Sequence, residues 1–289
     1  PLFYMRNLIN SIPTESIKSY GMRVLVSSKS PMMLQIFVSV LNEIGCCVDK
    51  VVMSEDETDP ICVFVDVLKL QHEAIGIFVD SNGETMVLID ERGRVIQNEM
   101  LTALMSLILL KSKIRTELFV PLTAPTVIEK MASTHKGRVI RTKSSRQSMM
   151  EDLLDCKRED LNSRIEIFNL YFDALAGATR IIEYLSRHRV ALFEVINEIP
   201  EFHMKSKTVE CPWVDKGKVI RNLIESERKN PMELLDGVKV NHDRGWALVL
   251  PDADAPLCRV YSEGYSEEYA ESLTDMYINK IERIRKRKS

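Results

Sequence analysis

Cysteine and histidine are scarce in this sequence and follow no metal-binding pattern. The 289 residues contain 6 cysteines and 5 histidines, and no Cys-X-X-Cys pair occurs. These spacings give no transition-metal site. No secretory signal sequence comes before the cysteines, so we expect a reduced, cytoplasmic chain.

Long hydrophobic runs and a large charge of one sign are also missing. The longest apolar run, Leu101 to Leu110, is shorter than the about 20 residues that a membrane-spanning helix needs. The net charge of −3 gives no general attraction to nucleic acid or to an anionic membrane. The basic run at Lys280–Lys288 is interpreted as the solvated end of a C-terminal helix. The sequence begins at Pro1 and enters a helical pattern at once, which suggests a piece of a longer chain.

What the sequence does contain is an alternation of strands and helices. Residues Arg23–Ser27 and Cys46–Met53 are expected to be strands, separated by a helix at Met32–Ile44 that Gly45 ends. This strand–helix–strand pattern predicts a parallel sheet. A second α/β unit is predicted from helices at Glu99–Lys111 and Pro125–His135 and strands at Glu117–Pro121 and Gly137–Arg141. Further helices are expected at Gln147–Leu161, Ala174–Arg187 and Val190–Ile199.

The last third of the chain predicts a smaller α+β domain. The mixed polar segment Glu201–Asp215 is interpreted as a hinge into it. A helix is expected at Lys216–Lys229, short strands within Asp236–Gly264, and a closing helix at Ser266–Arg283. The fold class is therefore α/β, with two consecutive α/β domains of mixed sheets flanked by helices, followed by the α+β domain.

Several phrases together resemble the α-D-phosphohexomutases, the family of phosphomannomutase and phosphoglucomutase. They are FVPLTAPTVIEK, GRVIRTK, ECPWVDKGKVIRNL, LLDGVKV, GWALVLPDADAP and RVYSEG. The resemblance implies the second, third and fourth of the family's four domains, at residues 1–97, 98–203 and 204–289, with the first domain missing. It is strongest to the mutase-like C-terminal region of bacterial fusions with a sugar nucleotidyltransferase of the mannose-1-phosphate guanylyltransferase type.

Active mutases of this family carry a phosphoryl group on a serine in the first domain and hold Mg²⁺ on a D-x-D-G-D-R loop. Without the serine's domain, no catalytic residue can be named. The metal loop aligns with Asp80, Asn82 and Glu84, where one carboxylate has become an amide and Thr85 replaces the arginine. Two interpretations stay open: a residual Mg²⁺ site, or an Asn-Gly hairpin turn.

The family's sugar-reading loop, G-E-x-S-G-H, has no counterpart between Met149 and Ala174. Asp173 matches an acidic residue after that loop and is expected to cap a helix. Lys143 matches a phosphate-contacting lysine of the family, and Arg146 follows it. These two residues are either a substrate-phosphate site or a solvated pair.

The family's phosphate loop, R-x-S-G-T-E-P, aligns with residues 250–256. Leu250 stands where a cation would pair with phosphate, and Asp252, Ala253 and Asp254 follow it. Two carboxylates would repel a phosphate by roughly 1 kcal/mol or more per charge pair. We therefore expect a capped polar turn here and no direct binding of phosphate.

Three functions remain open. The first is a mutase-like module without catalysis, structural or regulatory to a fused nucleotidyltransferase in nucleotide-sugar biosynthesis. The second is an active Mg²⁺-dependent mutase that interconverts sugar 1- and 6-phosphates once the serine domain is present. The third is a non-catalytic module that binds a sugar phosphate. Candidate partners are the nucleotidyltransferase, a sugar phosphate and a second copy of the chain, with no nucleic acid.

Overall fold

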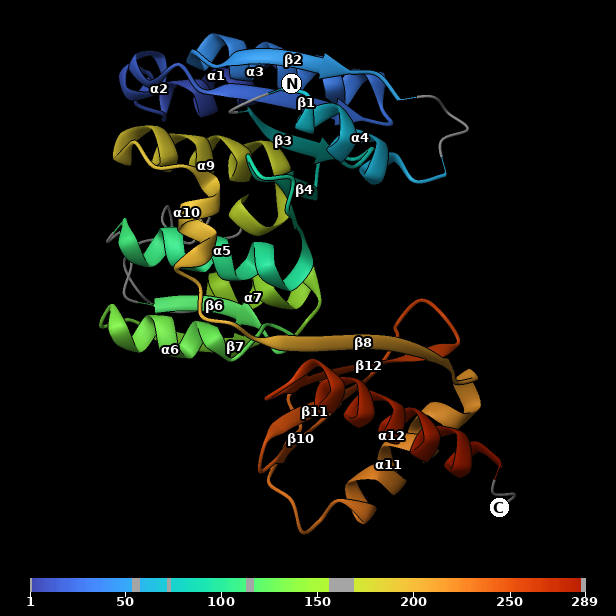
Figure 1. Ribbon diagram of the computed structural model, residues 1–289. Helices are drawn as coiled ribbons and strands as arrows, with labels where there is room; N and C mark the ends of the chain where they lie inside the picture. The colour runs from blue at the N-terminus through green and yellow to red at the C-terminus, as the bar shows by residue number, and fades with distance from the viewer. Residues whose placement is uncertain (1, 54–57, 72–73, 113–116, 156–168, 287–289) are drawn as a thin grey trace. The chain divides into compact units, whose positions relative to one another are not determined.

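The computed structural model describes residues 2–53, 58–71, 74–112, 117–155 and 169–286 (Figure 1). The chain divides into two compact units. The N-terminal unit comprises Pro1–Phe119, Ile128–Ile140 and Met149–Ile199, and the C-terminal unit comprises Val120–Val127, Arg141–Ser148 and Pro200–Ser289. The finer division into three domains at residues 97 and 203 stays a prediction.

A five-stranded mixed sheet organises the first part of the N-terminal unit, with the strand order β2-β1-β3-β4-β5. Strand β1 pairs in parallel with both β2 and β3, whereas β4 and β5 continue the sheet in antiparallel register. The expected parallel strands are therefore confirmed. The strands are β1 (Arg23–Ser28), β2 (Cys47–Val51), β3 (Ala74–Val79), β4 (Met86–Ile89) and β5 (Val95–Ile96).

Local capping defines the helices that accompany this sheet. Ser30 accepts a hydrogen bond from the Met33 N–H at the start of α3, and Gly45 ends that helix with φ 107°. Asp59 caps α4, a helix that was not expected from the sequence, by accepting from the Cys62 N–H at 3.1 Å. The helices are α1 (Leu2–Asn10), α2 (Thr14–Tyr20), α3 (Pro31–Ile44) and α4 (Pro60–Lys69).

The second part of the N-terminal unit is mainly helical. Helix α5 contains the longest apolar run of the sequence, and all its residues from Ala103 to Leu110 are buried. Its elements, four of which (β6, α6, β7 and α7) contain residues assigned to the C-terminal unit, are α5 (Asn98–Lys111), β6 (Glu117–Pro121), α6 (Val127–Thr134), β7 (Arg138–Thr142), α7 (Arg146–Asp155), α9 (Ala174–His188) and α10 (Leu192–Asn197). Strands β6 and β7 pair with each other. The helix expected at Gln147–Leu161 lies partly outside the described residues.

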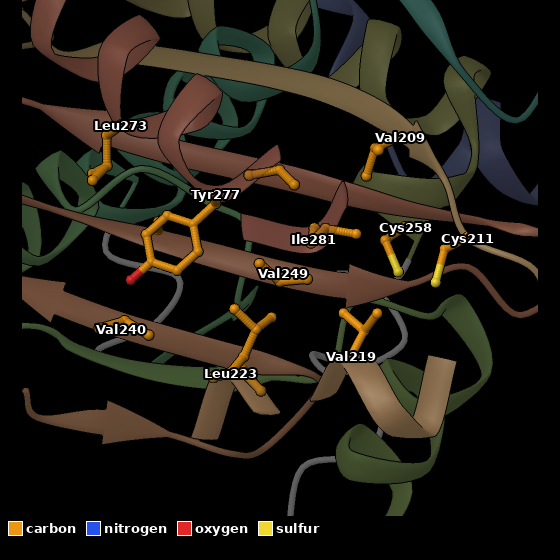
Figure 2. Packing of buried hydrophobic residues seen from close by; sticks show 13 residues of the cluster. Val209, Cys211, Val219, Leu223, Val240, Val249, Cys258, Leu273, Tyr277 and Ile281 are labelled. Atoms are coloured by element: carbon orange, nitrogen blue, oxygen red, sulfur yellow. The ribbon is translucent and has the colours of Figure 1, made fainter. Parts of the chain in front are cut away.

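The C-terminal unit is built on an antiparallel sheet with the strand order β8-β12-β11-β10-β9. Its elements are β8 (His203–Glu210), α11 (Trp213–Ser226), β9 (Met232–Glu233), β10 (Val238–His242), β11 (Gly245–Pro251), β12 (Leu257–Gly264) and α12 (Glu267–Lys286). Figure 2 shows its core, in which Leu223 of α11 and Tyr277 of α12 lie with Val249 of the sheet. Among the described helices of both units, none has the length and apolar character that a membrane crossing requires.

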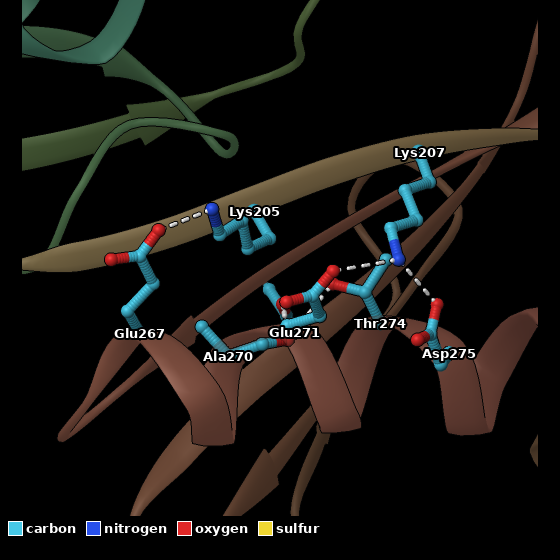
Figure 3. Close-up of polar contacts among 8 residues, drawn as sticks. Lys205, Lys207, Glu267, Ala270, Glu271, Thr274 and Asp275 are labelled. Carbon is cyan, nitrogen blue, oxygen red and sulfur yellow. Dashed lines mark hydrogen bonds and ion pairs between the residues drawn. The ribbon is translucent and has the colours of Figure 1, made fainter.

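The segment Glu201–Asp215, expected to be a hinge into the C-terminal domain, directly follows the boundary of the two units at Ile199 and Pro200. It is not a linker, however, because most of it is strand β8. All eight of its residues pair with β12, from Leu257↔Glu210 to Gly264↔His203. Lysines of β8 also pair with acidic residues of α12: Lys205 with Glu267 at 2.5 Å and Lys207 with Asp275 at 2.7 Å (Figure 3). Lys205 and Lys207 thus lie on the side of the edge strand that faces α12, together with the core residue Val209, whereas Ser206, Thr208 and Glu210 are exposed.

Candidate functional site

The loop that aligns with the family's phosphate loop closes the hairpin between β11 and β12. We call residues 252–256 the Asp252 loop. The two strands pair as far as Pro251↔Cys258, and the Asp252 N–H donates to the Leu257 carbonyl at 3.0 Å. The ends of the loop are therefore fixed by the sheet, and the expected polar turn is confirmed.

The carboxylate of Asp252 is held inside this loop. Its Oδ1 accepts hydrogen bonds from the backbone N–H groups of Asp254 and Ala255, each at 2.9 Å. Its Oδ2 accepts from Nε of Arg259 at 2.8 Å. The Asp254 N–H and the Arg259 guanidinium stabilise the ionised form and hold the pKa of Asp252 below its ordinary value. These two N–H groups of the loop therefore already donate hydrogen bonds to a carboxylate of the chain itself.

Two cations that the sequence analysis missed lie against the Asp252 loop. One is Arg259, and the other is Lys216 of α11, whose Nζ donates to the carbonyl of Asp252 at 2.5 Å and to that of Ala255 at 2.7 Å. Lys216 also lies 3.5 Å from the ring centre of Trp213. The hairpin register could have located Arg259, because Leu250 pairs with it. No sequence signal could have located Lys216.

The residues aligned with the metal loop form the turn between β3 and β4 in the N-terminal unit. We call residues 80–85 the Asp80 turn. Asp80 Oδ1 accepts from the Glu84 N–H at 2.9 Å, and its Oδ2 accepts from the Thr85 hydroxyl at 2.9 Å. Gly83 has φ 74°, which the glycine of an Asn-Gly turn adopts without strain. Of the two interpretations left open by the sequence, the structure thus shows the hairpin turn.

The local geometry of the Asp80 turn gives no support to an octahedral magnesium site. Both oxygens of Asp80 are engaged in closing the turn, and the next aligned ligand, Asn82, is neutral. Within the described part of the chain, no three histidine, cysteine or acidic side chains gather closely enough to hold a metal. The assignment of Asp80, Asn82 and Glu84 to a metal therefore stays a prediction without support from the local geometry.

A small cavity of about 310 Å³ lies beside the Asp80 turn, against Asn82 and Glu84. Its wall includes Asp173, which caps α9 as expected by accepting from the N–H groups of Leu175 and Ala176 at 3.0 Å. The other oxygen of Asp173 accepts from the Tyr4 hydroxyl. Burial and this hydrogen bond raise the pKa of Tyr4. Both oxygens of the Asp173 carboxylate thus accept hydrogen bonds from within the protein. The rest of the segment in which the sugar-reading loop was sought lies largely outside the described residues.

The predicted phosphate residues Lys143 and Arg146 follow β7 in the C-terminal unit. Lys143 is exposed, and Arg146 begins α7. Ser144, one of the two serines between them, donates its N–H to Asp236 Oδ2 at 2.8 Å, which places a carboxylate beside the candidate site. Whether Lys143 and Arg146 bind phosphate stays a prediction. The structure assigns the Asp80 turn to one unit and the Asp252 loop and Lys143 to the other.

Comparison with known proteins finds relatives along most of the chain. A phosphoglucomutase/phosphomannomutase from Thermococcus kodakarensis is 24% identical over 296 residues, covering 96% of this chain and 65% of the relative. A probable phosphoglucosamine mutase from Methanopyrus kandleri is 26% identical over 286 residues, covering 93% of this chain and 63% of the relative. No family model matches the sequence. The chain thus spans somewhat less than two thirds of these relatives.

Solved structures share the fold. A phosphoglucomutase/phosphomannomutase family protein from Burkholderia thailandensis matches with a TM-score of 0.80 at 13% identity, over 99% of this chain and 65% of that one. An N-acetylglucosamine-phosphate mutase of the α-D-phosphohexomutase superfamily matches with a TM-score of 0.62 at 13% identity, over 96% of this chain and 65% of that one. A third neighbour, from Aspergillus fumigatus, was solved with GlcNAc-6P and magnesium (TM-score 0.60, 9% identity, 94% and 65% covered).

The fold therefore defines a protein of phosphohexomutase architecture. The chain is similar in sequence to proteins named phosphoglucomutase/phosphomannomutase and phosphoglucosamine mutase, and the resemblance to phosphohexomutases inferred from the sequence is confirmed. The fusion to a nucleotidyltransferase stays a prediction.

Proposed function

We propose that this chain is a phosphohexomutase-like module that does not turn over sugar phosphates. The observation that carries the proposal is the Asp252 carboxylate, which occupies the backbone donors of the loop aligned with the family's phosphate loop. A phosphate would have to displace this carboxylate and also approach Asp254. Each like-charge pair opposes binding by roughly 1 kcal/mol even in water.

The Asp80 turn supports the same proposal. Phosphoryl transfer depends on positioning and on neutralising charge, and Thr85 stands where the family has an arginine. The hydroxyl of Thr85 donates to Asp80. A neutral hydroxyl that is already bonded to the turn supplies no positive charge to a phosphoryl group.

The role we propose for the module is structural or regulatory, within a protein of nucleotide-sugar biosynthesis. A fused or associated sugar nucleotidyltransferase is the partner that the sequence resemblance indicates. Folded modules of this size act in this way by docking to a neighbouring domain, which requires only an intact fold. Size-exclusion chromatography of the full-length protein with and without this region addresses whether the region also mediates self-association.

The active mutase is the second candidate, because the relatives that cover most of this chain carry mutase names. It requires a serine domain outside the present sequence and a metal held by Asp80, Asn82 and Glu84. The two candidates differ in one measurable property, which is turnover.

We expect no conversion of mannose 1-phosphate, glucose 1-phosphate or glucosamine 1-phosphate by the full-length protein in a coupled assay with Mg²⁺ and a sugar bisphosphate activator. The physical reason is the occupied Asp252 loop and the lack of an arginine at Thr85. Asp80→Ala tests any turnover that is found, and the exposed neighbour Ser81→Ala is its matched control. Turnover that Asp80→Ala abolishes and Ser81→Ala keeps would overturn the proposal in favour of the active mutase.

Substituting Asp252 by serine should create phosphate binding that the unmodified chain lacks. The change frees the N–H groups of Asp254 and Ala255 and the guanidinium of Arg259. Isothermal titration with inorganic phosphate should then give heat at millimolar concentration. The matched control is Asp254→Ser, which removes the same charge at an exposed position.

Three outcomes of this titration are informative. Binding by Asp252→Ser alone agrees with a loop occupied by its own carboxylate. Equal binding by both variants means that charge alone, and not occupied donors, kept phosphate out. Equal binding by the unmodified chain contradicts the proposal, and the loss of that heat in Lys143→Ala would place the anion at Lys143 instead.

A further inference from the structure

A cavity of about 770 Å³ in the N-terminal unit lies at the opposite end of the sheet from the Asp80 turn. It is lined by Met22 and Arg23 where β1 begins and by Ile75 near the start of β3. The Asp80 turn follows the other end of β3. The cavity therefore has no part in the candidate site described above. Its volume falls within the about 300–1,000 Å³ typical of sites for small organic ligands.

Cations outnumber carboxylates among the described residues that line this cavity. Arg23, Lys69 and Arg92 contribute three positive side chains, and Glu91 contributes one negative side chain. The two oxygens of Glu91 accept from the Leu192 and Phe193 N–H groups at 2.8 and 3.1 Å. This carboxylate is therefore held by the first turn of α10.

The positive side chains at the cavity keep donors available. Arg23 pairs with Asp49 at 3.6 Å and Lys69 with Asp66 at 3.4 Å, and the members of both pairs are half exposed or more. Exposed ion pairs of this kind contribute little to stability, because water screens them. An anionic ligand can therefore replace these partners at little cost. Arg92 lies 3.7 Å from the centre of the Phe193 ring, so its guanidinium plane is positioned by stacking.

The remaining wall suits a flat ring and not a sugar. Met22, Leu68 and Ile75 are apolar and buried, and the rings of Tyr20 and Phe193 also line the cavity. Gln71 Oε1 is buried and has no hydrogen-bond partner among the residues that the structure describes. A buried amide oxygen without a donor is unfavourable, because it has lost its hydrogen bonds to water and gained none in return. The wall thus combines apolar side chains with one buried acceptor that needs a donor.

We propose that this cavity binds an adenine nucleotide. Its phosphates pair with Arg23 and Lys69, and its base lies against the apolar wall. The 6-amino group of adenine donates to Gln71 Oε1, in the pairing that a glutamine amide and an adenine edge make elsewhere. A sugar phosphate lacks the flat apolar face, and inorganic phosphate is much smaller than the cavity. The proposal does not depend on whether the chain has mutase activity.

The test is titration of the 289-residue chain with ADP, adenosine and inosine diphosphate. Inosine diphosphate has the same shape but carries an oxygen in place of the 6-amino donor. We expect ADP to bind about tenfold or more tightly than adenosine, because adenosine lacks the two phosphates. We expect it to bind about fivefold more tightly than inosine diphosphate, which corresponds to one hydrogen bond. The Gln71→Leu variant should bind ADP and inosine diphosphate equally.

Variants of the cations locate the site. The double variant Arg23→Glu/Lys69→Glu should weaken ADP binding by about a hundredfold or abolish it. Lys50→Ala, an exposed lysine of β2 in the same unit, should bind ADP like the unmodified chain. Circular dichroism and thermal unfolding check that each variant is folded.

Three results would overturn the proposal. They are no ADP binding at millimolar concentration, binding that survives the double variant, and binding that Lys50→Ala weakens equally. Equal binding of ADP and inosine diphosphate by the unmodified chain would refute the assigned role of Gln71.

Discussion

Glu263→Ala should destabilise the C-terminal unit by about 3–5 kcal/mol. Glu263 is 8% exposed, and its carboxylate accepts three hydrogen bonds: from the Thr126 N–H at 2.9 Å, the Thr126 hydroxyl at 2.6 Å and Trp246 Nε1 at 2.8 Å. Alanine leaves these donors without an acceptor and opens a space beside Trp246. Folded domains are stable by only about 5–15 kcal/mol, so this loss is a large fraction of the total.

The measurement is urea unfolding followed by tryptophan fluorescence. The chain has 2 tryptophans, Trp213 and Trp246, and both belong to the C-terminal unit, so the signal reports on the unit that is altered. Glu263→Gln is the isosteric comparison. Its amide oxygen can accept from the Thr126 N–H and from Trp246, and its NH₂ can donate to the Thr126 hydroxyl. We therefore expect the free energy of unfolding to fall by only about 1–2 kcal/mol. Glu268→Ala, an exposed residue of α12, should change stability by less than about 0.5 kcal/mol. A Glu263→Ala midpoint equal to that of Glu268→Ala would show that the three hydrogen bonds contribute nothing.

Elements with strong local signals were predicted from the sequence. Gly45 was expected to end α3 and does so with φ 107°. Asp173 was expected to cap a helix, and it accepts from two N–H groups of α9. Both features depend on a few adjacent residues, so the chain's local chemistry suffices to indicate them.

Elements that depend on distant partners were missed. In strand β8 only the side chain of Val209 is buried. Its sequence therefore lacks the regular alternation of apolar and polar residues that would indicate a strand. Its strand conformation comes from pairing with β12, whose residues lie about 50 positions later. Helix α4 carries a β-branched run that does not favour a helix, and burial of Phe64 and Leu68 outweighs that preference.

In the candidate site, too, local features could be predicted from the sequence and long-range contacts could not. The two carboxylates of the Asp252 loop were visible in the sequence and rightly indicated a capped turn. The cations around them were not visible, because Lys216 reaches the loop from α11 across 36 positions. The sequence therefore indicated a loop that repels phosphate. The structure adds that the loop's donors are occupied, which is why Asp252→Ser and Asp254→Ser are expected to differ.

The retained phrase DGVKV owes its glycine to backbone geometry, and Gly237→Ala should destabilise the C-terminal unit by about 3–5 kcal/mol. Gly237 has φ 76°, and a Cβ atom there would lie 2.2 Å from the Val249 carbonyl oxygen. The left-handed conformation alone is unfavourable by about 1–2 kcal/mol for alanine. The contact with β11 adds the rest, because a backbone oxygen in a paired strand can move little.

Two other glycines of the same unit separate these contributions under the same Gly→Ala change. Gly245 has no left-handed φ, but its Cβ would lie 2.1 Å from the Glu263 carbonyl oxygen, so Gly245→Ala should show the steric effect alone, about 1–3 kcal/mol. Gly217 lies inside α11 with nothing within 4 Å of its Cβ position, so Gly217→Ala should stabilise the unit by about 0.5–1 kcal/mol. Urea unfolding by tryptophan fluorescence should rank the stabilities as Gly217→Ala, then the unmodified chain, then Gly245→Ala, then Gly237→Ala. If Gly237→Ala were as stable as the unmodified chain, the glycine of DGVKV would not be required by the backbone of this hairpin, and a role for it in binding would have to be sought instead.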